Sequence, residues 1–341
     1  MSRITALNRI TARNFMRRRV LALLAGGAVA PGLFLAADQA HAQDYPIRPI
    51  RLIVPWAPGG GTDTLARIVA GKLGEALKQQ VNVENRAGAA SLIGMTAVAN
   101  AAADGYTFGL ATSNLAANPY LYSQQPFEVQ RDLAPVVLVA KGVYAMAVNP
   151  NLPAKTVTEF IALARANPDK YNAALIGAGA PPHLALAQFT GMTGTRIVGI
   201  QYKGAGPAMQ ATVADETQLI FASYNTLQPM VQASRLRLLA VTSAKRAAAA
   251  PDVPTAVESG LPGFVFDEWY GIFAPAKTPR SAIERMNAEV RKVMELPEVR
   301  DRLRSLAAEP AAGTPEALGE FVRTEMARLQ KLIAENNIKG D

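Results

Sequence analysis

Residues 50–73 read IRLIVPWAPGGGTDTLARIVAGKL and hold the transition that decides the fold class. The β-branched run Ile50–Val54 predicts a strand, and the apolar spacing of Thr62–Leu77 predicts a helix. Between the two stand a proline, a tryptophan and three consecutive glycines. Glycine lets the backbone approach a ligand closely, and a helix start presents unpaired N–H groups and the positive end of the helix dipole. The turn is therefore a candidate site for a small anion.

Spacing alone leaves two interpretations of this turn open. Either its backbone N–H groups bind an anion, with Gly60 at positive φ, or the glycines form a connector with Thr62 or Asp63 as the helix cap. Inside an anion site, Asp63 would cap the helix or accept a hydrogen bond from an amino or hydroxyl group of the ligand. The common nucleotide-binding patterns are excluded, because the chain has neither GxxxxGK[ST] nor GxGxxG.

The rest of the chain alternates in the same way between short strands and helical patterns. Strands are predicted at residues 50–54, 81–84, 106–110, 136–139, 144–148, 172–176, 197–201, 218–222, 236–242 and 270–274. Helices are predicted at residues 62–77, 91–102, 157–167, 182–190 and 206–214. This order predicts an α/β fold with mostly parallel sheets, in which ligands bind beyond the carboxyl ends of the strands. Turns rich in glycine and small polar residues follow strands at residues 58–63, 85–91, 112–114, 177–183 and 202–206.

Capping patterns mark three further helix starts. These are Thr156 with Glu159, Ser281 with Glu284, and Thr314 before a proline at the first helical position. In the last predicted helix, apolar residues recur on one stripe between Leu318 and Ile333, so we expect this helix to pack against a lobe.

The first 42 residues predict export. Three arginines at 17–19 precede an apolar stretch, Val20–Ala37, and Ala40-His41-Ala42 has the small-x-small pattern of a cleavage site. We interpret residues 1–42 as a secretory signal peptide, cut before Gln43, and Arg17–Leu21 also resembles a twin-arginine signal. A retained membrane anchor is the alternative. No other stretch approaches the roughly 18 apolar residues of a membrane helix.

Charge argues against a nucleic-acid partner. The chain has 35 basic and 27 acidic residues. Residues 1–42 contain six arginines and one aspartate, so 29 basic and 26 acidic residues remain after cleavage, a net charge of +3. Basic clusters interleaved with aromatic residues are absent from the remaining sequence. A slightly positive surface mildly attracts small anions.

The inventory of reactive side chains is poor for an enzyme. The chain has no cysteine and two histidines, of which His41 leaves with the signal peptide. Thiol nucleophiles, disulfides and sites with two histidine ligands are thereby excluded. A Ser-His-Asp triad would have to use His183, and no serine stands in a G-x-S-x-G context. We expect no metal and no cofactor.

Six stretches carry a resemblance to a known family. They are, in chain order, YPIRPIRLIVPWAPGGGTDTLAR, VNVENRAGAASLIG, DGYTFGLATSNLAANPYLY, QYKGAGPAM, RLLAVTSAKRAAAAPDVPTAVESGLPGF and WYGIFAPAKTPRSAIERMN. The chain resembles the substrate-binding proteins of tripartite tricarboxylate transporters, also called Bordetella uptake gene receptors, over essentially all of the mature sequence. The resemblance implies a type II periplasmic binding-protein fold, in which two α/β lobes enclose a ligand cleft. It also implies a small carboxylate ligand without metal or cofactor.

The resemblance assigns ligand-binding positions on both lobes. On the first lobe they are Trp56, Gly59, Gly60, Thr62, Asp63, Gly88, Ser91, Thr112 and Ser113. On the second lobe they are Gly177, Gly179, His183, Tyr202 and Gly204.

The chain departs from the family pattern at two turns. Ala180 stands where relatives usually have a serine, and Ala89 and Ala90 stand where glycine is common. With Trp56 in place of a frequent phenylalanine, these changes make the pocket more apolar. They favour an aromatic or longer aliphatic acid, including a dicarboxylate.

Several prominent side chains have a structural interpretation beside the functional one. Arg86 would suit a carboxylate ligand, but an ion pair with Glu84 or another acid is favoured. His183 is expected to cap a helix or to line the pocket edge rather than to act in catalysis. Trp269 and Tyr270 are expected to pack in the core or hinge rather than to stack on a ligand.

The resemblance predicts lobes that are discontinuous in sequence. Residues 43–143 and 266–341 would form the first lobe, and residues 144–265 the second. The predicted function is a periplasmic receptor that captures a small carboxylate and delivers it to a membrane transporter, acting as a monomer. A receptor that presents its ligand to a signalling sensor protein is the alternative, and an enzyme on the same fold is less favoured.

Overall fold

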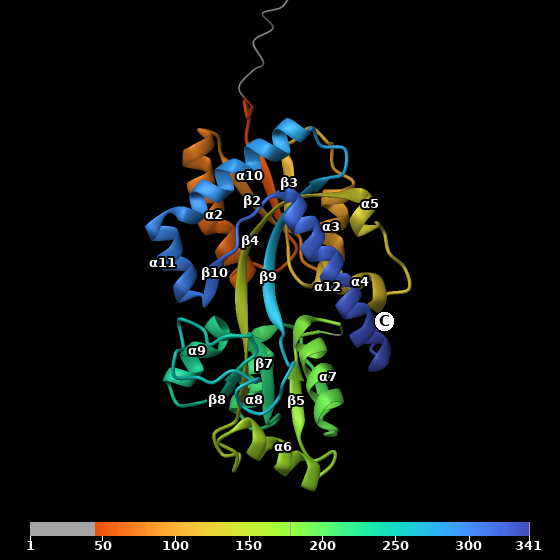
Figure 1. Cartoon of the computed structure of the whole chain (residues 1–341), viewed down its shortest axis with the longest axis vertical. Helices are drawn as coiled ribbons and strands as arrows, with labels where there is room; N and C mark the ends of the chain where they lie inside the picture. The colour runs from red at the N-terminus through yellow and green to blue at the C-terminus, as the bar shows by residue number, and fades with distance from the viewer. Residues whose placement is uncertain (1–44, 178, 341) are drawn as a thin grey trace, which may run out of the picture. The chain divides into compact units, whose positions relative to one another are not determined.

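The computed structural model describes residues 45–177 and 179–340 (Figure 1), so the predicted signal peptide lies outside the described residues. Within the described part of the chain, no helix has the length and apolar character needed to span a membrane.

The first group of strands surrounds the stretch that opened the sequence analysis. Strand β1 (Ile50–Val54) pairs in parallel with β2 (Val81–Asn85) and β3 (Thr107–Ala111). Strand β3 then pairs antiparallel with β9 (Asp267–Pro275). Four of the five β1 residues are buried, because the strand is covered by helices on both faces. Helices of this part are α2 (Gly61–Leu77), α3 (Leu92–Ala99), α4 (Asn114–Leu121), α5 (Val129–Asp132), α10 (Arg280–Glu295), α11 (Pro297–Ser305) and α12 (Pro315–Glu335).

The second group of strands has the same layered arrangement. Strand β5 (Asn172–Leu175) pairs in parallel with β6 (Val198–Gln201) and β7 (Leu219–Ser223). Strand β8 (Arg237–Val241) completes the group. Its helices are α6 (Val157–Ala166), α7 (Pro181–Thr193), α8 (Ala205–Val213) and α9 (Tyr224–Gln232). Together the two groups form the two-lobe α/β fold that the resemblance predicted.

Two long antiparallel strands join the groups. Strand β4 spans Leu133–Val148; its first part pairs with β9, and Tyr144–Val148 pair with β7 and β8. The short strand β10 (Ala308–Pro310) also pairs with β4. The sequence predicted two separate strands here, at 136–139 and 144–148, and that prediction was wrong. Lys141-Gly142 breaks the apolar pattern, but its backbone is held in the ladder opposite Trp269 and Glu268. The lobe boundaries at residues 143 and 266 stay a prediction.

Two of the three predicted helix caps are confirmed. The Thr156 hydroxyl accepts from the Glu159 N–H at 3.2 Å, and the Thr314 hydroxyl accepts from the Ala317 N–H at 3.2 Å. The Ser281 cap was wrong, because α10 begins at Arg280 and its N-cap, Pro279, lies two residues before Ser281. Helix α12 buries Leu318, Val322, Leu329 and Ile333 of its predicted apolar stripe, whereas Phe321 and Met326 are half-buried.

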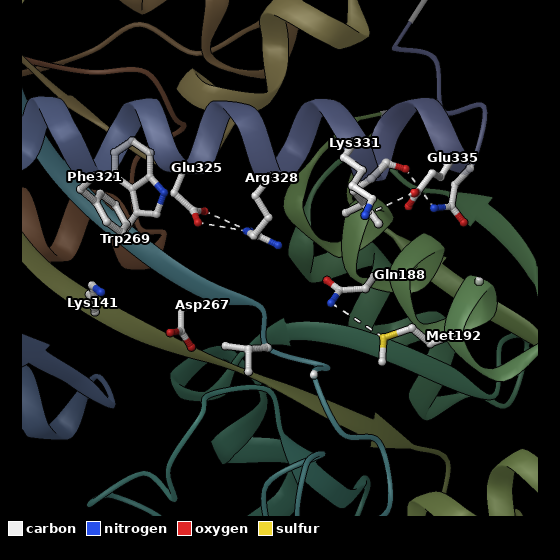
Figure 2. Close-up of a pocket in the computed structure, with 15 residues that line it drawn as sticks. Lys141, Gln188, Met192, Asp267, Trp269, Phe321, Glu325, Arg328, Lys331 and Glu335 are labelled. Atoms are coloured by element: carbon white, nitrogen blue, oxygen red, sulfur yellow. Dashed lines mark hydrogen bonds and ion pairs between the residues drawn. The ribbon is translucent and has the colours of Figure 1, made fainter.

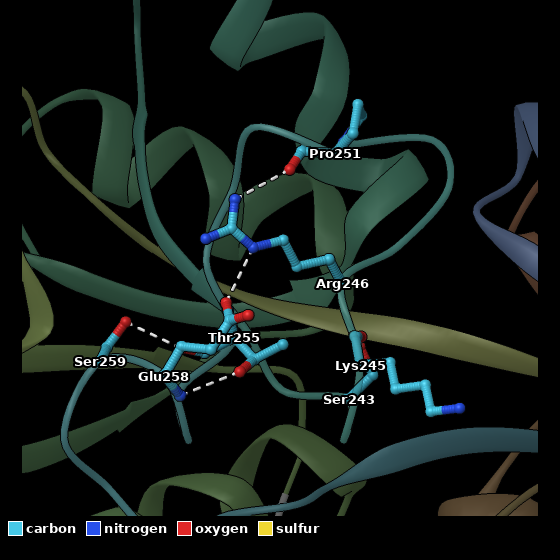
Figure 3. A network of polar contacts seen from close by, with 7 residues as sticks. All are labelled: Ser243, Lys245, Arg246, Pro251, Thr255, Glu258 and Ser259. Carbon is cyan, nitrogen blue, oxygen red and sulfur yellow. Dashed lines mark hydrogen bonds and ion pairs between the residues drawn. The ribbon is translucent and has the colours of Figure 1, made fainter.

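The irregular segment after β8 is held by a polar network (Figure 3). The Glu258 carboxylate accepts from Arg246 Nε at 2.8 Å and from the Thr255 N–H at 2.9 Å. The Thr255 hydroxyl accepts in return from the Glu258 N–H at 3.0 Å, which is the reciprocal pattern of a capping box. Arg246 also donates to the Pro251 carbonyl. The network replaces the hydrogen bonds that a regular element would supply, so this stretch keeps a defined path without helix or strand.

Candidate ligand-binding site

The strand register places the turns that follow the parallel strands of both groups near the middle of the β4–β9 pair. Strand β3 ends at Ala111, opposite Gly271 of β9, and Gly271 pairs with Leu138 of β4. Strand β7 ends at Ser223, opposite Tyr144 of β4. Six residues of β4 separate these two points, about 20 Å at strand spacing. The carboxyl ends of both groups of parallel strands therefore point to the middle of the β4–β9 pair.

The glycine turn after β1 has its left-handed residue at Gly59. Gly59 has φ +84°, whereas Gly60, the N-cap of α2, has φ −78° and ψ 170°. The expectation of a positive φ at Gly60 was wrong, because Gly60 already has the extended conformation of an N-cap. No side chain caps this helix start. The N–H groups of Gly61, Thr62 and Asp63 precede the first helical hydrogen bond, from the Thr64 N–H to the Gly60 carbonyl, and can donate to an anion.

Asp63 braces the turn from within α2. Its buried carboxylate accepts from the Gly59 N–H at 2.9 Å, from Arg67 Nε at 3.0 Å and from Asn85 Nδ2 at 2.9 Å. Burial alone would raise the pKa of Asp63, but the hydrogen bonds from Arg67, Gly59 and Asn85 together lower it. The same Asn85 amide donates to the Trp56 carbonyl at 3.0 Å. Asp63 thus organises the turn, and Asn85 is a second organising residue that the sequence did not single out.

The turn after β2 is built differently. Gly88 has φ +134°, and the next three residues, Ala89, Ala90 and Ser91, have φ values of +44°, +46° and +79°. Left-handed backbone costs about 1–2 kcal/mol for each residue with a side chain. Asn118 of α4 holds the turn, donating through Nδ2 to the Ala90 carbonyl at 2.9 Å. The alanines that depart from the family pattern are therefore positions of backbone strain.

Unpaired buried polar atoms gather where β3 runs into α4. Ser113 Oγ, both side-chain atoms of Asn114 and Asn118 Oδ1 are buried without a hydrogen-bond partner in the described part of the chain. Beside them, Trp56 Nε1 donates to Thr112 Oγ1 at 3.3 Å. Buried polar atoms are nearly always paired in native proteins, so unpaired ones mark a place for a ligand or water. The sequence named Thr112 and Ser113 but missed Asn114 and Asn118, whose i, i+4 spacing on one helix face was the available signal.

The second-lobe turn after β5 is held by its histidine. The Gly179 N–H donates to His183 Nδ1 at 3.0 Å, which leaves the imidazole proton on Nε2. Burial lowers the pKa of His183, so the ring is neutral at pH 7. A Cβ on Gly179 would lie 2.7 Å from Leu121 Cδ1 at the end of α4, so this turn meets the first-lobe helix that carries the asparagines. His183 therefore holds the turn in front of α7 without capping the helix itself, and its contact with a ligand stays a prediction.

A buried carboxylate lies behind the meeting point of α2 and α9. A Cβ on Gly61 would lie 3.3 Å from Asn225 Nδ2 and 3.8 Å from the Tyr270 hydroxyl. Glu268, also buried, accepts from Ser223 Oγ at 2.8 Å and from the Tyr144 hydroxyl at 3.4 Å. Burial raises the pKa of Glu268 despite these hydrogen bonds. Sequence reasoning did not find Glu268 or Asn225.

Comparison with known proteins decides the family. Residues 65–338 match the family model described as the tripartite tricarboxylate transporter family receptor. The chain belongs to this receptor family.

Solved structures of related receptors have the same fold. The R. palustris protein Rpa4515 with adipate is 31% identical, with a TM-score of 0.82, over 86% of this chain and 99% of that one. The periplasmic binding protein BugD is 30% identical, with a TM-score of 0.79, over 86% and 99%. MatC from Rhodopseudomonas palustris with bound malate is 29% identical, with a TM-score of 0.77, over 85% and 100%. The family and fold expected from the resemblance are confirmed.

Within this receptor, the site residues expected from the sequence fall into two sets. Trp56, Thr112 and the glycine turn are joined by hydrogen bonds, and Ser91 lies beside Asn118. Tyr202 and Gly204 lie in the connection between β6 and α8, where the Tyr202 N–H donates to the Leu175 carbonyl and the Gly204 N–H to the Tyr202 carbonyl. Contact of any of these residues with a ligand stays a prediction.

The remaining side chains follow their structural interpretations in the receptor. Arg86 Nε donates to Glu84 Oε1 at 2.6 Å, as expected for an ion pair. Trp269 and Tyr270 are buried in the two strands that join the lobes, as expected for core or hinge packing.

Proposed function

We propose that the protein is a periplasmic receptor that binds a small dicarboxylate between its lobes and delivers it to a tripartite tricarboxylate-type membrane transporter. The observation that carries this proposal is the group of unpaired buried atoms on Ser113, Asn114 and Asn118. It lies at the carboxyl end of β3, beside the turn that presents the uncapped start of α2. The relatives with adipate and with malate support a dicarboxylate.

The two kinds of group suit the two ends of such a ligand. One carboxylate would accept from the backbone N–H groups at the start of α2, where the helix dipole adds to the attraction. The other would accept from Ser113 Oγ and Asn114 Nδ2, while water or a ligand hydroxyl donates to the free amide oxygens. Ala89, Ala90 and Ala180 add methyl groups around this region, which favours a longer aliphatic or aromatic chain between the carboxylates.

No catalytic step is part of this proposal. The imidazole of His183 is engaged through Nδ1 by the Gly179 N–H, so it lacks a free base position on that side. Within the described residues, no group of three or more His, Asp or Glu side chains is placed to hold a metal ion. The receptor would act as a monomer and release its ligand unchanged.

The test is a thermal-shift and native mass-spectrometry screen of protein beginning at Gln43. The panel holds aliphatic dicarboxylates of four to eight carbons, aromatic dicarboxylates and the monocarboxylate matched to each. A ligand at one hundred times its Kd adds about 2.7 kcal/mol of stability. We expect dicarboxylates to bind and thereby to stabilise the folded protein. The matched monocarboxylates should bind with at least tenfold lower affinity.

Variants locate the binding. Asn114→Ala should weaken the best ligand ten- to a hundredfold, because it removes charge-assisted hydrogen bonds worth about 1.5–3 kcal/mol each. Asn151→Ala, at an exposed asparagine, is the control and should bind as wild type does. If Asn114→Ala binds the ligand as tightly as Asn151→Ala does, the Asn114 side chain is not part of the site. Uptake of labelled ligand by cells that lack only this receptor separates transport from signalling.

A further inference from the structure

A second candidate site is a cavity on the opposite face of the strands that join the lobes. Its volume is about 630 Å³, within the range of small-molecule sites. Strands β4 and β9 supply Lys141, Asp267 and Trp269, helix α12 supplies Phe321 and Arg328, and α7 lies across from them (Figure 2). Alternate residues of a strand point to opposite faces. Asp267 and Trp269 therefore face this cavity, whereas Glu268 and Tyr270 face the candidate carboxylate site.

Unpaired buried atoms line this cavity as they line the candidate carboxylate site. Asp267 Oδ1, Trp269 Nε1 and Gln188 Oε1 are buried without a hydrogen-bond partner in the residues that the structure describes. Trp269 is fully buried, so its indole N–H does not donate a hydrogen bond to bulk water. The wall of the cavity thus contains two acceptors and one donor that are unpaired among the described residues.

Among the described residues, the charges around the cavity leave one cation and one anion outside any ion pair, although Lys141 still acts electrostatically on Asp267. Arg328 pairs with Glu325 at 3.0 Å, and Lys331 pairs with Glu335 at 3.7 Å. Neither Lys141 nor Asp267 forms an ion pair among the described residues. Instead, Lys141 Nζ lies over the Phe321 ring, 4.7 Å from its centroid. A cavity with one free charge of each sign complements a zwitterion.

We propose that this cavity is a second ligand site, for a small zwitterionic amino acid. The ligand ammonium donates to Asp267 Oδ1 and Gln188 Oε1, and its carboxylate accepts from Trp269 Nε1 and pairs with Lys141. This site is separate from the candidate carboxylate site and does not depend on the proposed transport function.

The electrostatics of Asp267 predict a pH dependence for this site. Burial raises the pKa of Asp267 to about 6; Lys141 and Arg328 act to lower it, and Glu325 acts to raise it. The ammonium requires the ionised carboxylate, so zwitterion affinity should be constant above pH 7 and fall as the pH drops below about 6.

The two tryptophans of the chain provide a reporter for each site. Trp56 lies in the glycine turn, and Trp269 lines the second cavity, so a Trp56→Phe protein has a single indole N–H signal, that of Trp269. We would titrate ¹⁵N-labelled Trp56→Phe protein at pH 7.5 with 4-aminobutyrate, with butyrate and with butylamine. We expect a saturable downfield shift of the indole proton with 4-aminobutyrate, and at least tenfold weaker effects from the two analogues that lack one charge.

Variants in the same background complete the test. Asp267→Asn keeps the side-chain shape and should lower the affinity for 4-aminobutyrate at least tenfold. Lys141→Met should lower it to a similar extent. Asp252→Asn, at an exposed position that does not line the cavity, should leave its affinity within twofold. Thermal unfolding of each variant shows that the fold is kept. The proposal is overturned if zwitterions of two to six carbons give no saturable shift, if butyrate binds as well as 4-aminobutyrate, or if Asp267→Asn binds unchanged.

Discussion

Two turns of the first lobe hold the same place in the fold and are built in opposite ways. Each leads from a parallel strand into a helix beside the candidate site. The turn after β1 puts its left-handed conformation on Gly59 and is braced by a buried carboxylate with three donors. The turn after β2 puts left-handed conformations on Ala89, Ala90 and Ser91 and is held by the Asn118 amide. The first turn is therefore positioned by side-chain hydrogen bonds, and the second stores backbone strain.

The largest expected effect comes from removing the brace of the first turn. Asp63→Ala removes the acceptor for Gly59, Arg67 and Asn85, and charge-assisted hydrogen bonds contribute about 1.5–3 kcal/mol each. Because the losses are not additive, we expect the free energy of unfolding to fall by about 3 kcal/mol. Urea denaturation measures the change. Asp301→Ala, at an exposed position, should stay within about 0.5 kcal/mol of wild type. A similarly small effect of Asp63→Ala would mean that the glycines hold the turn without help.

The same carboxylate gives the first turn a pH dependence. The pKa of Asp63 is lowered in the folded protein, so its contribution to stability is present above the unfolded pKa, near 4, and is lost as the pH falls through the folded pKa. Comparison with Asp63→Asn cancels the titration of the other carboxylates. The difference in free energy of unfolding between the two proteins should be constant from pH 7 to pH 5 and shrink below pH 4. A constant difference down to pH 2.5 would contradict the lowered pKa.

Ligand affinity tests the role of the first turn directly. Gly60 has φ −78°, and a Cβ there has only the Ala57 carbonyl within 4 Å, at 3.8 Å, so valine fits the fold. Under the proposed function, Gly60→Val crowds the ligand and should weaken binding about ten- to a hundredfold for each hydrogen bond lost. Titration followed by Trp56 fluorescence measures this. Gly71→Val, farther along α2 where a Cβ has no atom within 4 Å, is the control and should bind the ligand as wild type does. Unchanged affinity in Gly60→Val would make the glycines a simple connector.

The smallest effect is the release of strain in the second turn. Ala90→Gly removes the penalty of a left-handed alanine at φ +46° but adds backbone entropy to the unfolded chain. We expect a net gain of about 1 kcal/mol in the free energy of unfolding. Ala97→Gly, inside α3, is the control and should lose about 1 kcal/mol. If both substitutions destabilise, the second turn is not strained at Ala90 and the contrast between the two turns disappears.

The sequence predicted much of this architecture because its signals are local. The strand Ile50–Val54 and the helix that follows it are set by β-branched residues and helical spacing, and the Thr156 and Thr314 caps by side chains near the helix starts. The glycine turn was found for the same reason. The family motifs extended this local information to the fold and to most of the candidate carboxylate site.

Only the tertiary structure decided the features that depend on distant partners. Strand β4 runs through Lys141-Gly142 because β9 pairs with it there, over a hundred residues away in sequence. The left-handed alanines are held by a hydrogen bond from Asn118. The side-chain amide of Asn114 is unpaired because of the residues that pack around it in the described structure. In the cavity lined by α12, α7 and β9, Asp267 Oδ1 and Trp269 Nε1 have no hydrogen-bond partner among the described residues. Composition and periodicity determine which elements form, but long-range packing determines which of their polar groups are left free to bind.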